Sequence, residues 1–388
     1  MIEKLVCDSN AKRIGYFSTY PPRECGIANY TKDLIDAISE LGELKPSIIA
    51  INEKGAIYSY DRRVKFVIDR DNAQDYIKAA EYVNSSNIQL LVIQHEFGLY
   101  GGDYGEYIKF FLENVKKPII TTLHTVQPNF DKKAIEVLKY ITRKSEVIIV
   151  IAHAAINMLK QQGIACKKYV VIPHGCPSIE FTSGDSAKEA LCLKDRLVTS
   201  TFGLISSGKG IEYAIQALPE VIKKEPRIIY LIIGETHPEV RKHEGEKYRN
   251  ELTRLVNELG LEKHVRFTNR FLTKRELSKY LQATDIYLTP YISPNQISSG
   301  TLIYALGAGK AVVSTPYYHA QEVLANDRGL LCKFQDSASI TAGINRLLDE
   351  SLRKEIQNRA YKYSRRFLWK NVAKKYINLI KAVTENNE

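Results

Sequence analysis

Four small residues stand where a helix is expected to begin in the last third of the chain: Ser298, Ser299, Gly300 and Thr301. The start of a helix leaves backbone N–H groups unpaired and carries partial positive charge, so these residues could surround an anion such as a phosphate. Ser and Thr are also favoured as ordinary N-caps. This stretch alone therefore does not separate an anion site from a plain cap.

Two further positions suit the binding of a phosphorylated ligand. Lys209 lies in the loop SSGKG and supplies a cation there, although a solvated loop lysine is the simpler alternative. Gly26 ends the polar loop STYPPRECG and would let a backbone N–H approach a ligand closely, unless it only opens a helix. Both residues could contact a diphosphate.

Two of the eight histidines end apolar segments that resemble strands, VIQH and TTLH. These are His95, which Glu96 follows, and His124. A lone histidine is more often structural than catalytic, but the carboxyl end of a strand favours contact with a ligand. Glu322 is a further candidate, and its alternative is capping at a helix start. The Cys and His residues show no spacing typical of a metal site, so we predict no metal.

Apolar runs separated by helical stretches organise the first half of the chain. A short β-rich run from Arg13 leads through a polar loop into a helix that carries Tyr30 and Leu34 at helical spacing and stops at Gly42. Further strand candidates read SIIAI, VKFVI, QLLVIQ, PIITTL, VIIVIA and YVVIP. Continuous apolar strands belong in a parallel sheet covered on both faces, so we predict a doubly wound α/β domain.

The same alternation begins again after a segment rich in Gly, Pro and Ser, which predicts a second α/β domain. We place the first domain at residues 1–178 and the second at 179–365. Residues 366–388 are expected to form a helix whose apolar stripe around Trp369 packs back on the first domain. The two domains would face one another across a central cleft, where open α/β sheets bind ligands.

Composition and charge narrow the classes of function. A chain of 388 residues that is 44% hydrophobic and 26% charged is globular. Its scattered cysteines and short apolar runs predict a cytoplasmic protein. The formal charge of +11 admits nucleic acid, an anionic membrane surface or a phosphorylated substrate as partner. The basic residues do not cluster into a nucleic-acid motif, so we predict no nucleic-acid partner and leave open a peripheral contact with the inner face of the membrane.

Five segments follow one another in a fixed order along the chain: PPRECGIANYTKDL, TTLH, VIPHG, FGLISSGKG and ALGAGKAVVSTPYYHAQEVL. In this order and spacing they resemble the GT-B-fold glycosyltransferases of family 4, the glycosyl transferases group 1. The resemblance spans nearly the whole chain and implies two Rossmann-like doubly wound domains facing a central cleft. It also implies a nucleotide-sugar donor held mainly by the second domain and an acceptor held mainly by the first.

The resemblance implies roles for individual residues around the donor. Those expected to bind it are Gly26, Lys209, Arg270, Phe271, Ser298, Ser299, Gly300, Thr301 and Tyr304. Arg270 and Phe271 follow the strand segment VRFTN, where the family contacts the nucleotide base, although an aromatic residue there more often fills the core. Gly26 would approach the diphosphate from the first domain.

The resemblance also implies the catalytic and acceptor residues, with two departures from the family pattern. The catalytic candidates are His124, Gln296 and Glu322, and the acceptor-binding candidates are His95 and Glu96. Gln296 and Tyr304 stand where the family usually has two glutamates. An amide can still bind sugar hydroxyls, but a tyrosine lacks the bidentate acceptor that a ribose diol prefers. The donor base, the sugar and the retaining or inverting outcome therefore stay open.

The predicted function is transfer of a hexosyl group, with mannosyl as one candidate, from a nucleotide-diphosphate sugar to a saccharide or glycolipid acceptor. No cofactor is expected besides this co-substrate, because cationic side chains and helix ends do the work of a metal in this fold class. Two alternatives are a glycoside phosphorylase on the same fold and a non-catalytic nucleotide or nucleic-acid binding protein. The sequence leaves the acceptor and the oligomeric state open.

Overall fold

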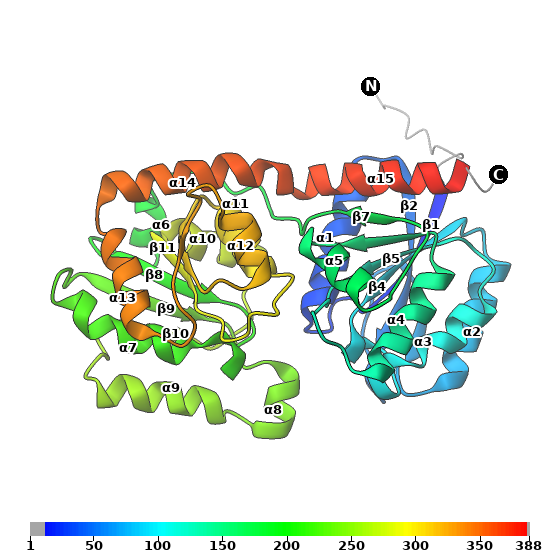
Figure 1. The fold of residues 1–388 in the computed structure, drawn as a ribbon, viewed down its shortest axis with the longest axis horizontal. Coiled ribbons are helices and arrows are strands. Elements are labelled where there is room, and N and C mark those ends of the chain that lie inside the picture. Colours follow the sequence, from blue (N-terminus) through cyan, green and yellow to red (C-terminus); the bar gives the residue numbers. More distant parts are fainter. Residues whose placement is uncertain (1–11, 386–388) are drawn as a thin grey trace. The chain divides into compact units, whose positions relative to one another are not determined.

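The chain divides into two compact units in a computed structural model that describes residues 12–385 (Figure 1). The first unit comprises Met1–Gly175 and Trp369–Glu388, and the second comprises Cys176–Leu368. The chain thus leaves the first unit after Gly175 and returns to it at Trp369. From sequence, we placed these boundaries after residues 178 and 365.

The first unit contains a sheet of seven parallel strands in the order β3-β2-β1-β4-β5-β6-β7. The strands are β1 (Lys12–Ser18), β2 (Leu44–Asn52), β3 (Val64–Asp69), β4 (Leu90–His95), β5 (Ile119–Leu123), β6 (Val147–Val150) and β7 (Tyr169–Val171). Strand β4 is buried at all six positions, as the continuous apolar runs predict for a sheet covered on both faces.

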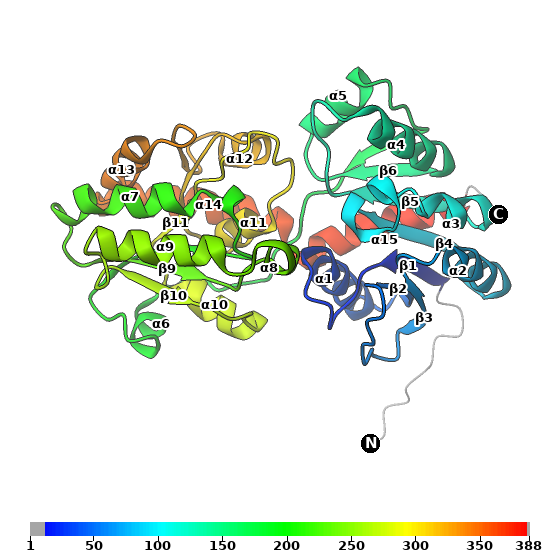
Figure 2. The same cartoon turned by 90° about the horizontal axis from the view of Figure 1, so that it is seen from below.

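Helices cover both faces of this sheet (Figures 1 and 2). They are α1 (Gly26–Glu40), α2 (Ala73–Ser85), α3 (Ile108–Asn114), α4 (Lys132–Lys144), α5 (Ala154–Gln161) and α15 (Trp369–Glu385), with short 3-10 turns η1 (Phe97–Leu99) and η2 (Asp103–Gly105). Adjacent residues of β1 point to opposite faces of the sheet and pack in different cores. Tyr16 packs with α1 and α15, whereas Phe17 packs with α2, α3 and α4.

The C-terminal apolar stripe is divided between the two units. Phe367 lies in the 3-10 turn η4 (Arg365–Phe367) and packs in a core of the second unit. The backbone turns to extended geometry at Leu368, and α15 then begins with Trp369, which packs in the core of the first unit. A Cβ added at Gly175 would lie 2.3 Å from atoms of the Trp369 ring, so only glycine fits against this side chain.

The second unit contains a sheet of six parallel strands in the order β10-β9-β8-β11-β12-β13. The strands are β8 (Leu197–Phe202), β9 (Ile228–Ile233), β10 (Val265–Thr268), β11 (Ile286–Thr289), β12 (Ala311–Ser314) and β13 (Leu330–Leu331). Together with the first sheet, this arrangement confirms the prediction of two doubly wound α/β domains.

The helices of the second unit also lie on both faces of its sheet. They are α6 (Asp185–Ala190), η3 (Ser207–Lys209), α7 (Ile211–Ile222), α8 (Pro238–Glu244), α9 (Lys247–Glu258), α10 (Lys274–Ala283), α11 (Gly300–Gly307), α12 (Tyr318–Leu324), α13 (Ser337–Arg346) and α14 (Glu350–Ser364). One core joins α10, α11 and α12 to the sheet, and the other joins α7, α9 and α13. Gly245 (φ 61°) ends α8 and separates it from α9.

The described helices include none that is both long and apolar enough to cross a lipid bilayer.

Candidate functional site

Each sheet reverses its strand order at one point. In the first unit the reversal lies between β1 and β4, and in the second unit it lies between β8 and β11. Ligands of open α/β sheets bind outside the carboxyl ends of the strands at such a reversal. Most candidate site residues of each unit follow the strands at or next to these points, whereas Arg270 and Phe271 follow the edge strand β10.

In the second unit, Lys209 contacts a tyrosine that the sequence reasoning missed. The Lys209 Nζ donates a hydrogen bond to the Tyr291 hydroxyl at 2.8 Å and lies 4.4 Å from the centre of its ring. Tyr291 follows β11, and its hydroxyl also lies 2.9 Å from the Thr301 Oγ1 at the start of α11. Tyr291 comes directly after the strand segment DIYLTP, and this position was the signal that could have identified it.

The N-terminus of α11 differs from the prediction at Ser299. The Ser299 backbone N–H donates to the Nδ1 of His319 at 2.8 Å, so this N–H is already used within the protein. The Ser299 side chain caps the helix by accepting a hydrogen bond from the Leu302 N–H. The expectation that the Ser299 N–H is available to a ligand is therefore wrong, because His319, on α12, accepts its hydrogen bond.

The next two N–H groups of α11 remain available. Within residues 12–385, no acceptor pairs with the backbone N–H groups of Gly300 and Thr301. Gly203, which follows β8 with φ 131°, leaves room beside them: a Cβ added there would lie 3.2 Å from Thr301 and 3.6 Å from the Lys209 Nζ. The cation, the small glycine and two free donors thus meet at the reversal of the second sheet.

Gln296 and Ser298 lie on the loop before α11. The amide nitrogen of Gln296 donates to the carbonyl of Ser298, and the carbonyl of Gln296 accepts from the His319 N–H at 3.1 Å. The Gln296 side chain is exposed and folds back on its own loop. The loop therefore brings Gln296 and Ser298 next to Ser299 and His319.

Three further donor candidates, Arg270, Phe271 and Tyr304, and the catalytic candidate Glu322 remain. Arg270 follows the edge strand β10 and forms an exposed ion pair with Glu276 at 2.7 Å. Phe271 is 44% exposed, so the alternative that it fills the core is wrong. Tyr304, on α11, packs partly buried against Phe202 at the end of β8, with 6.2 Å between the ring centres. Glu322 is the fifth residue of α12, which excludes the alternative of a cap at the helix start.

In the first unit, His124 follows β5 and is held by buried neighbours. Its Nε2–H donates to the Gln94 Oε1 at 2.7 Å, and its ring meets the ring of Tyr30 edge-on at 4.7 Å. Burial, aided by the nearby His174 and His95, lowers the pKa of His124 to about 3. The imidazole is therefore neutral at physiological pH and can exchange hydrogen bonds but not supply a cation.

His95 is fully buried at the end of β4. Its ring stacks on Tyr100 and meets Phe97 edge-on, and neither ring nitrogen has a hydrogen-bond partner within the described chain. Contact with an acceptor would require these aromatic side chains to move. Glu96 accepts hydrogen bonds from the Phe97 N–H at 3.0 Å and the Thr125 hydroxyl at 2.5 Å, and burial raises the pKa of its carboxyl.

We expect the first unit to lose stability in acid because of these two histidines. Burial lowers the pKa of both His95 and His124 to about 3, from about 6.5 in an unfolded chain. Below pH 6.5 both histidines are protonated in the unfolded state but stay neutral in the folded state. The free energy of unfolding therefore falls by up to about 1.4 kcal/mol per pH unit for each histidine as the pH drops towards 3.

This acid sensitivity can be measured by urea unfolding between pH 7.5 and roughly pH 5. The chain has one tryptophan, Trp369, and it packs in the first unit, so its fluorescence reports that unit alone. His95→Gln should make the pH dependence shallower, whereas the exposed His243→Gln of the second unit should not. An unchanged slope in His95→Gln would rule out this account of the buried imidazole.

Tyr30 links the candidate site of the first unit to α15. Its hydroxyl lies 3.0 Å from that of Tyr376, which in turn lies 2.8 Å from the Thr122 Oγ1 on β5. The Tyr30 ring also meets the rings of His174 and Trp369 edge-on, at 5.0 and 5.1 Å. A helix from the far end of the sequence therefore supports the residues around His124.

Gly26 is the first residue of α1. The N-cap of this helix, Cys25, makes no side-chain hydrogen bond to the helix, and a Cβ added at Gly26 would meet no atom within 4 Å. The helix start is thus open on this side. The space around Gly26 leaves room for a ligand, and its contact with the donor stays a prediction.

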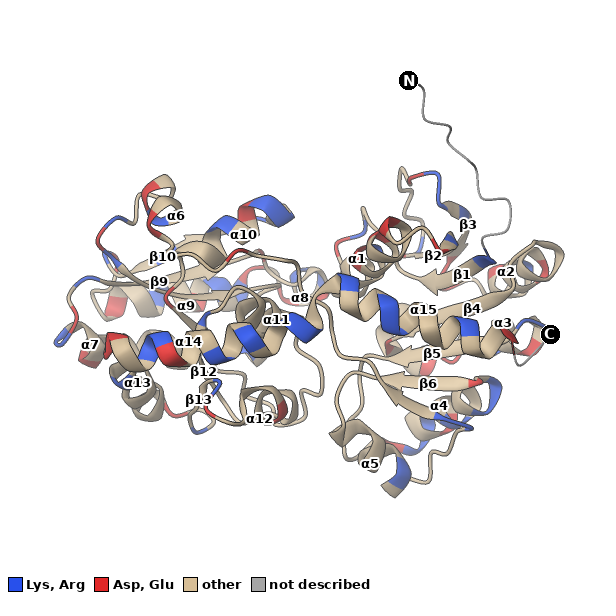
Figure 3. Cartoon of the chain, turned by 90° about the horizontal axis from the view of Figure 1, so that it is seen from above, with Lys and Arg blue, Asp and Glu red and all other residues tan. Residues whose placement is uncertain are grey.

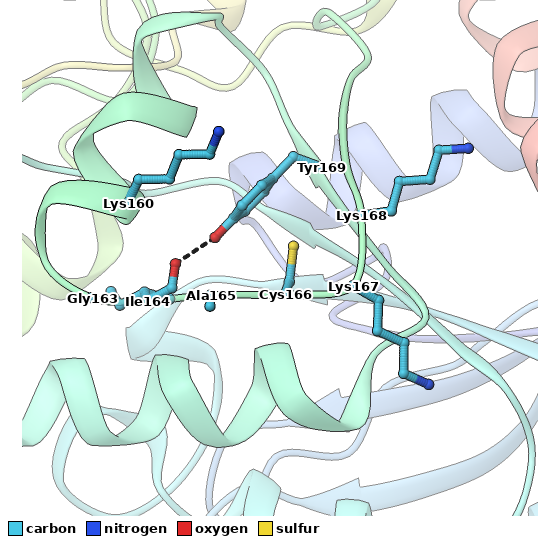
Figure 4. A pocket seen from close by; sticks show the side chains of 8 residues that line it. All are labelled: Lys160, Gly163, Ile164, Ala165, Cys166, Lys167, Lys168 and Tyr169. Atoms are coloured by element: carbon cyan, nitrogen blue, oxygen red, sulfur yellow. Dashed lines mark hydrogen bonds between the residues drawn. The ribbon is translucent and has the colours of Figure 1, made fainter.

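Lys and Arg residues of α3, α4, α5 and the loop before β7 line two hollows of the first unit, and Figure 3 marks the basic positions of α4 and α5 in blue. Two adjacent hollows of about 400 and 420 Å³ share Gly163 and Ala165. Their basic lining residues, which we call the basic groove, are Lys109, Lys139, Arg143, Lys160, Lys167 and Lys168. Figure 4 shows part of it, where the Tyr169 hydroxyl donates to the Ile164 carbonyl. Residues 167 and 168 precede β7, so this part of the groove lies at the amino edge of the sheet, opposite His124.

Potential metal ligands do not gather in the structure. Residues 12–385 contain no group of three or more His, Cys, Asp or Glu side chains arranged to hold a metal ion.

Comparison with known proteins gives matches to one family model and to curated relatives. Residues 186–367 match the family described as glycosyl transferases group 1. An uncharacterized glycosyltransferase of Methanocaldococcus jannaschii is 27% identical over 247 residues, which cover 61% of this chain and 59% of the relative. The D-inositol 3-phosphate glycosyltransferase of Corynebacterium urealyticum is 26% identical over 224 residues, which cover 56% and 51%. The matched region thus spans less than two thirds of either relative.

Solved structures share the fold over nearly the whole chain. Sucrose-phosphate synthase from Thermosynechococcus elongatus superposes with a TM-score of 0.80 at 16% identity, covering 97% of this chain and all of that one. Anabaena HepE in complex with UDP and glucose gives a TM-score of 0.75 at 16% identity, covering 96% of this chain and 100% of that one. At these identities the likeness establishes the fold.

Proposed function

We propose that this chain, a GT-B-fold member of the glycosyl transferases group 1 by its residues 186–367, moves a hexosyl group from a nucleotide-diphosphate sugar to a saccharide or glycolipid acceptor. Mannosyl is one candidate for the hexosyl group. The nucleotide-sugar donor is supported by HepE, which was solved with UDP and with UDP-glucose. The acceptor class rests on the sequence resemblance. Reaction in the cytoplasm is part of the same proposal.

The observation that carries this proposal is the cation beside a helix start at the reversal of the second sheet. Lys209 lies in a loop after β8, close to the free N–H groups of Gly300 and Thr301. No carboxylate within residues 12–385 forms an ion pair with Lys209, so its charge is not neutralised within the protein. An unneutralised cation beside aligned N–H donors suits the diphosphate of a nucleotide sugar.

The chemistry assigned to these residues is electrostatic. As the bond between sugar and diphosphate breaks, negative charge grows on the leaving diphosphate, and Lys209 with the N–H groups of Gly300 and Thr301 stabilises it. In the first unit, the neutral imidazole of His124 would exchange hydrogen bonds with a sugar or acceptor hydroxyl. Gln296 and Glu322 remain candidates for contacts with the sugar.

A thermal-shift panel tests this function. UDP, GDP, ADP and inorganic phosphate are each added to the full chain, because a ligand that binds only the native state raises its melting temperature. We expect one nucleoside diphosphate to raise it and phosphate alone to have no effect. A shift with phosphate alone would favour a glycoside phosphorylase, and no shift with any ligand would contradict the proposal.

The panel is run with EDTA because we propose that binding needs no metal. The cationic side chain and the helix start take the place of a divalent ion at the diphosphate. A nucleoside diphosphate that binds only after Mg²⁺ or Mn²⁺ is restored would overturn this part of the proposal.

We further propose that peripheral contact with an anionic membrane uses the basic groove. Near an anionic surface each Lys or Arg contributes roughly 1 kcal/mol. The full chain should therefore sediment with vesicles containing phosphatidylglycerol but not with pure phosphatidylcholine. Replacing Lys139, Arg143 and Lys160 by Ala should weaken this binding by at least about tenfold. Equal binding of the parent to both vesicle types would contradict the proposed membrane contact. Equal binding by the variant and the parent to the anionic vesicles would contradict it as well.

A further inference from the structure

The ammonium group of Lys209 has an unusual hydrogen-bond partner. The side chain is half-buried, and the ion pairs within residues 12–385 include none that involves it. Its hydrogen bond goes instead to the hydroxyl of Tyr291, at 2.8 Å. The flexible lysine stem would otherwise leave the ammonium group many positions to sample. The tyrosine fixes one of them.

Tyr291 is itself held rigidly. It is 5% exposed, and its ring stacks on that of Tyr317 with 5.1 Å between the centres and 17° between the planes. The carbonyl of Tyr291 accepts a hydrogen bond of 2.6 Å from the Thr315 hydroxyl. On the other side, the Tyr291 hydroxyl lies 2.9 Å from the Thr301 Oγ1. These contacts leave the phenol oxygen little freedom to move.

Tyr291 therefore joins two parts of the candidate donor site. It receives the hydrogen bond from Lys209, and this leaves its own hydroxyl proton for Thr301 at the start of α11. The ammonium group is thus held at a fixed distance from the N–H groups of Gly300 and Thr301. Fixing binding groups in advance strengthens binding, because less freedom is lost when the ligand arrives.

We infer that Tyr291 is the positioning residue of Lys209, which its phenol oxygen holds in place for the diphosphate of the donor. This inference rests on the proposed function, since it assumes that a nucleoside diphosphate binds beside Lys209. It goes beyond the family resemblance, which points to the lysine loop and the helix start but not to the residue after β11.

The pair also predicts a distinctive response to alkali. Burial opposes ionisation of Tyr291, but the charge and hydrogen bond of Lys209, together with hydrogen bonds to Thr301 and Ser299, hold the pKa of Tyr291 below its ordinary value. A tyrosinate beside Lys209 would cancel its charge and repel a diphosphate. The other titratable groups nearby are Tyr287 and Tyr317 in the same stack, His319 behind Ser299, and His237 near Lys209.

These neighbours do not reproduce the effect in alkali. Burial raises the pKa of Tyr287 and of Tyr317, so both stay neutral where Tyr291 ionises. Burial lowers the pKa of His237, and this residue is neutral well before alkaline pH. A fall in diphosphate affinity with rising pH would therefore come from Tyr291 first.

The test compares two buried hydroxyls of one stacked pair. Tyr291→Phe removes the hydroxyl that contacts Lys209, and Tyr317→Phe removes one that lies 3.0 Å from the Thr289 Oγ1 and also interacts with Ser299 and Ser314. The affinity for the nucleoside diphosphate found in the panel is measured by calorimetry from pH 7 to roughly pH 10, with the melting temperature of each variant recorded. At pH 7 we expect Tyr291→Phe to bind about tenfold more weakly than Tyr317→Phe.

The pH profile separates positioning from a purely structural role. The parent and Tyr317→Phe should lose affinity as the pH rises, whereas Tyr291→Phe should keep its affinity to higher pH. Equal affinities and equal profiles in the two variants, with a parent that binds, would overturn the inference and leave the proposed function intact. A parent that binds no nucleoside diphosphate would instead refute the proposed function, and the inference with it.

Discussion

Replacing Lys209 by Ala is expected to weaken binding of a nucleoside diphosphate by roughly 100-fold, the upper end for loss of one charge-assisted hydrogen bond. The reason is that the side chain of Lys209 contacts an uncharged tyrosine within residues 12–385. The Lys209 Nζ contacts the hydroxyl of Tyr291, and that hydroxyl contacts the Thr301 Oγ1. Neither hydroxyl can replace the positive charge of Lys209. The fold should survive, because the ammonium group forms no ion pair within residues 12–385 that the fold would lose.

The matched control for this variant is Lys263→Ala. Lys263 is exposed and precedes β10, at the amino edge of the same sheet, so its removal lowers the net charge equally without touching the candidate site. Calorimetric titration should find the control within about twofold of the parent. Parent-like affinity in Lys209→Ala, or an equal loss in both variants, would show that the diphosphate binds elsewhere.

Removal of residues after Leu368 should unfold the first unit. Helix α15 contributes seven buried side chains to its core: Trp369, Val372, Ala373, Tyr376, Ile377, Ile380 and Val383. Burial of each larger side chain stabilises the folded state by roughly 1.5–3 kcal/mol. The summed contribution of α15 approaches or exceeds the roughly 5–15 kcal/mol free energy of unfolding of a typical domain. Scanning calorimetry should therefore show that the transition of the first unit is lost. A truncated chain with the parent's transitions would make α15 dispensable.

A milder pair of variants checks the same contact in a folded chain. Ile380 is fully buried on α15, whereas Lys374 on the same helix is exposed. Ile380→Ala should lower the free energy of unfolding of the first unit by about 2–5 kcal/mol, and Lys374→Ala should change it by no more than about 0.5 kcal/mol. Urea unfolding followed by Trp369 fluorescence measures both. Similar values for the two variants would contradict the packing described here.

The fold was predictable because buried parallel strands leave a strong local signal. Six apolar runs in the first half of the chain correspond to β2 through β7, and helical spacing marked α1. The division of the C-terminal stripe was harder to foresee. Phe367 and Trp369 read as one stripe, but the extended backbone at Leu368 sends them into different cores. The spacing of apolar residues along the sequence does not reveal that one residue, Leu368, leaves the helical backbone conformation.

The candidate site was predictable at the level of loops but not of individual atoms. The resemblance identified the loop of Lys209 and the start of α11. It could not show that His319 occupies the N–H of Ser299, because that contact joins residues on different elements. Tyr291 carried no motif of its own, and its part became visible only through distances to Lys209 and Thr301.

The candidate residues of the first unit illustrate the same limit. His95 and His124 both end apolar strands, and sequence alone treats them alike. The structure separates them, because His124 has a hydrogen-bond partner in Gln94, whereas His95 lies among aromatic rings and has no such partner among the described residues. The expectation that Gly26 approaches the diphosphate from the first domain stays a prediction.

The most direct test of the central claim is a crystal structure of the full chain with the nucleoside diphosphate that the panel identifies. We expect the diphosphate within hydrogen-bond distance of the Lys209 Nζ and of the N–H groups of Gly300 and Thr301, with Tyr291 still in contact with the lysine. A nucleoside diphosphate bound with its phosphates away from Lys209 and from the start of α11 would contradict the account.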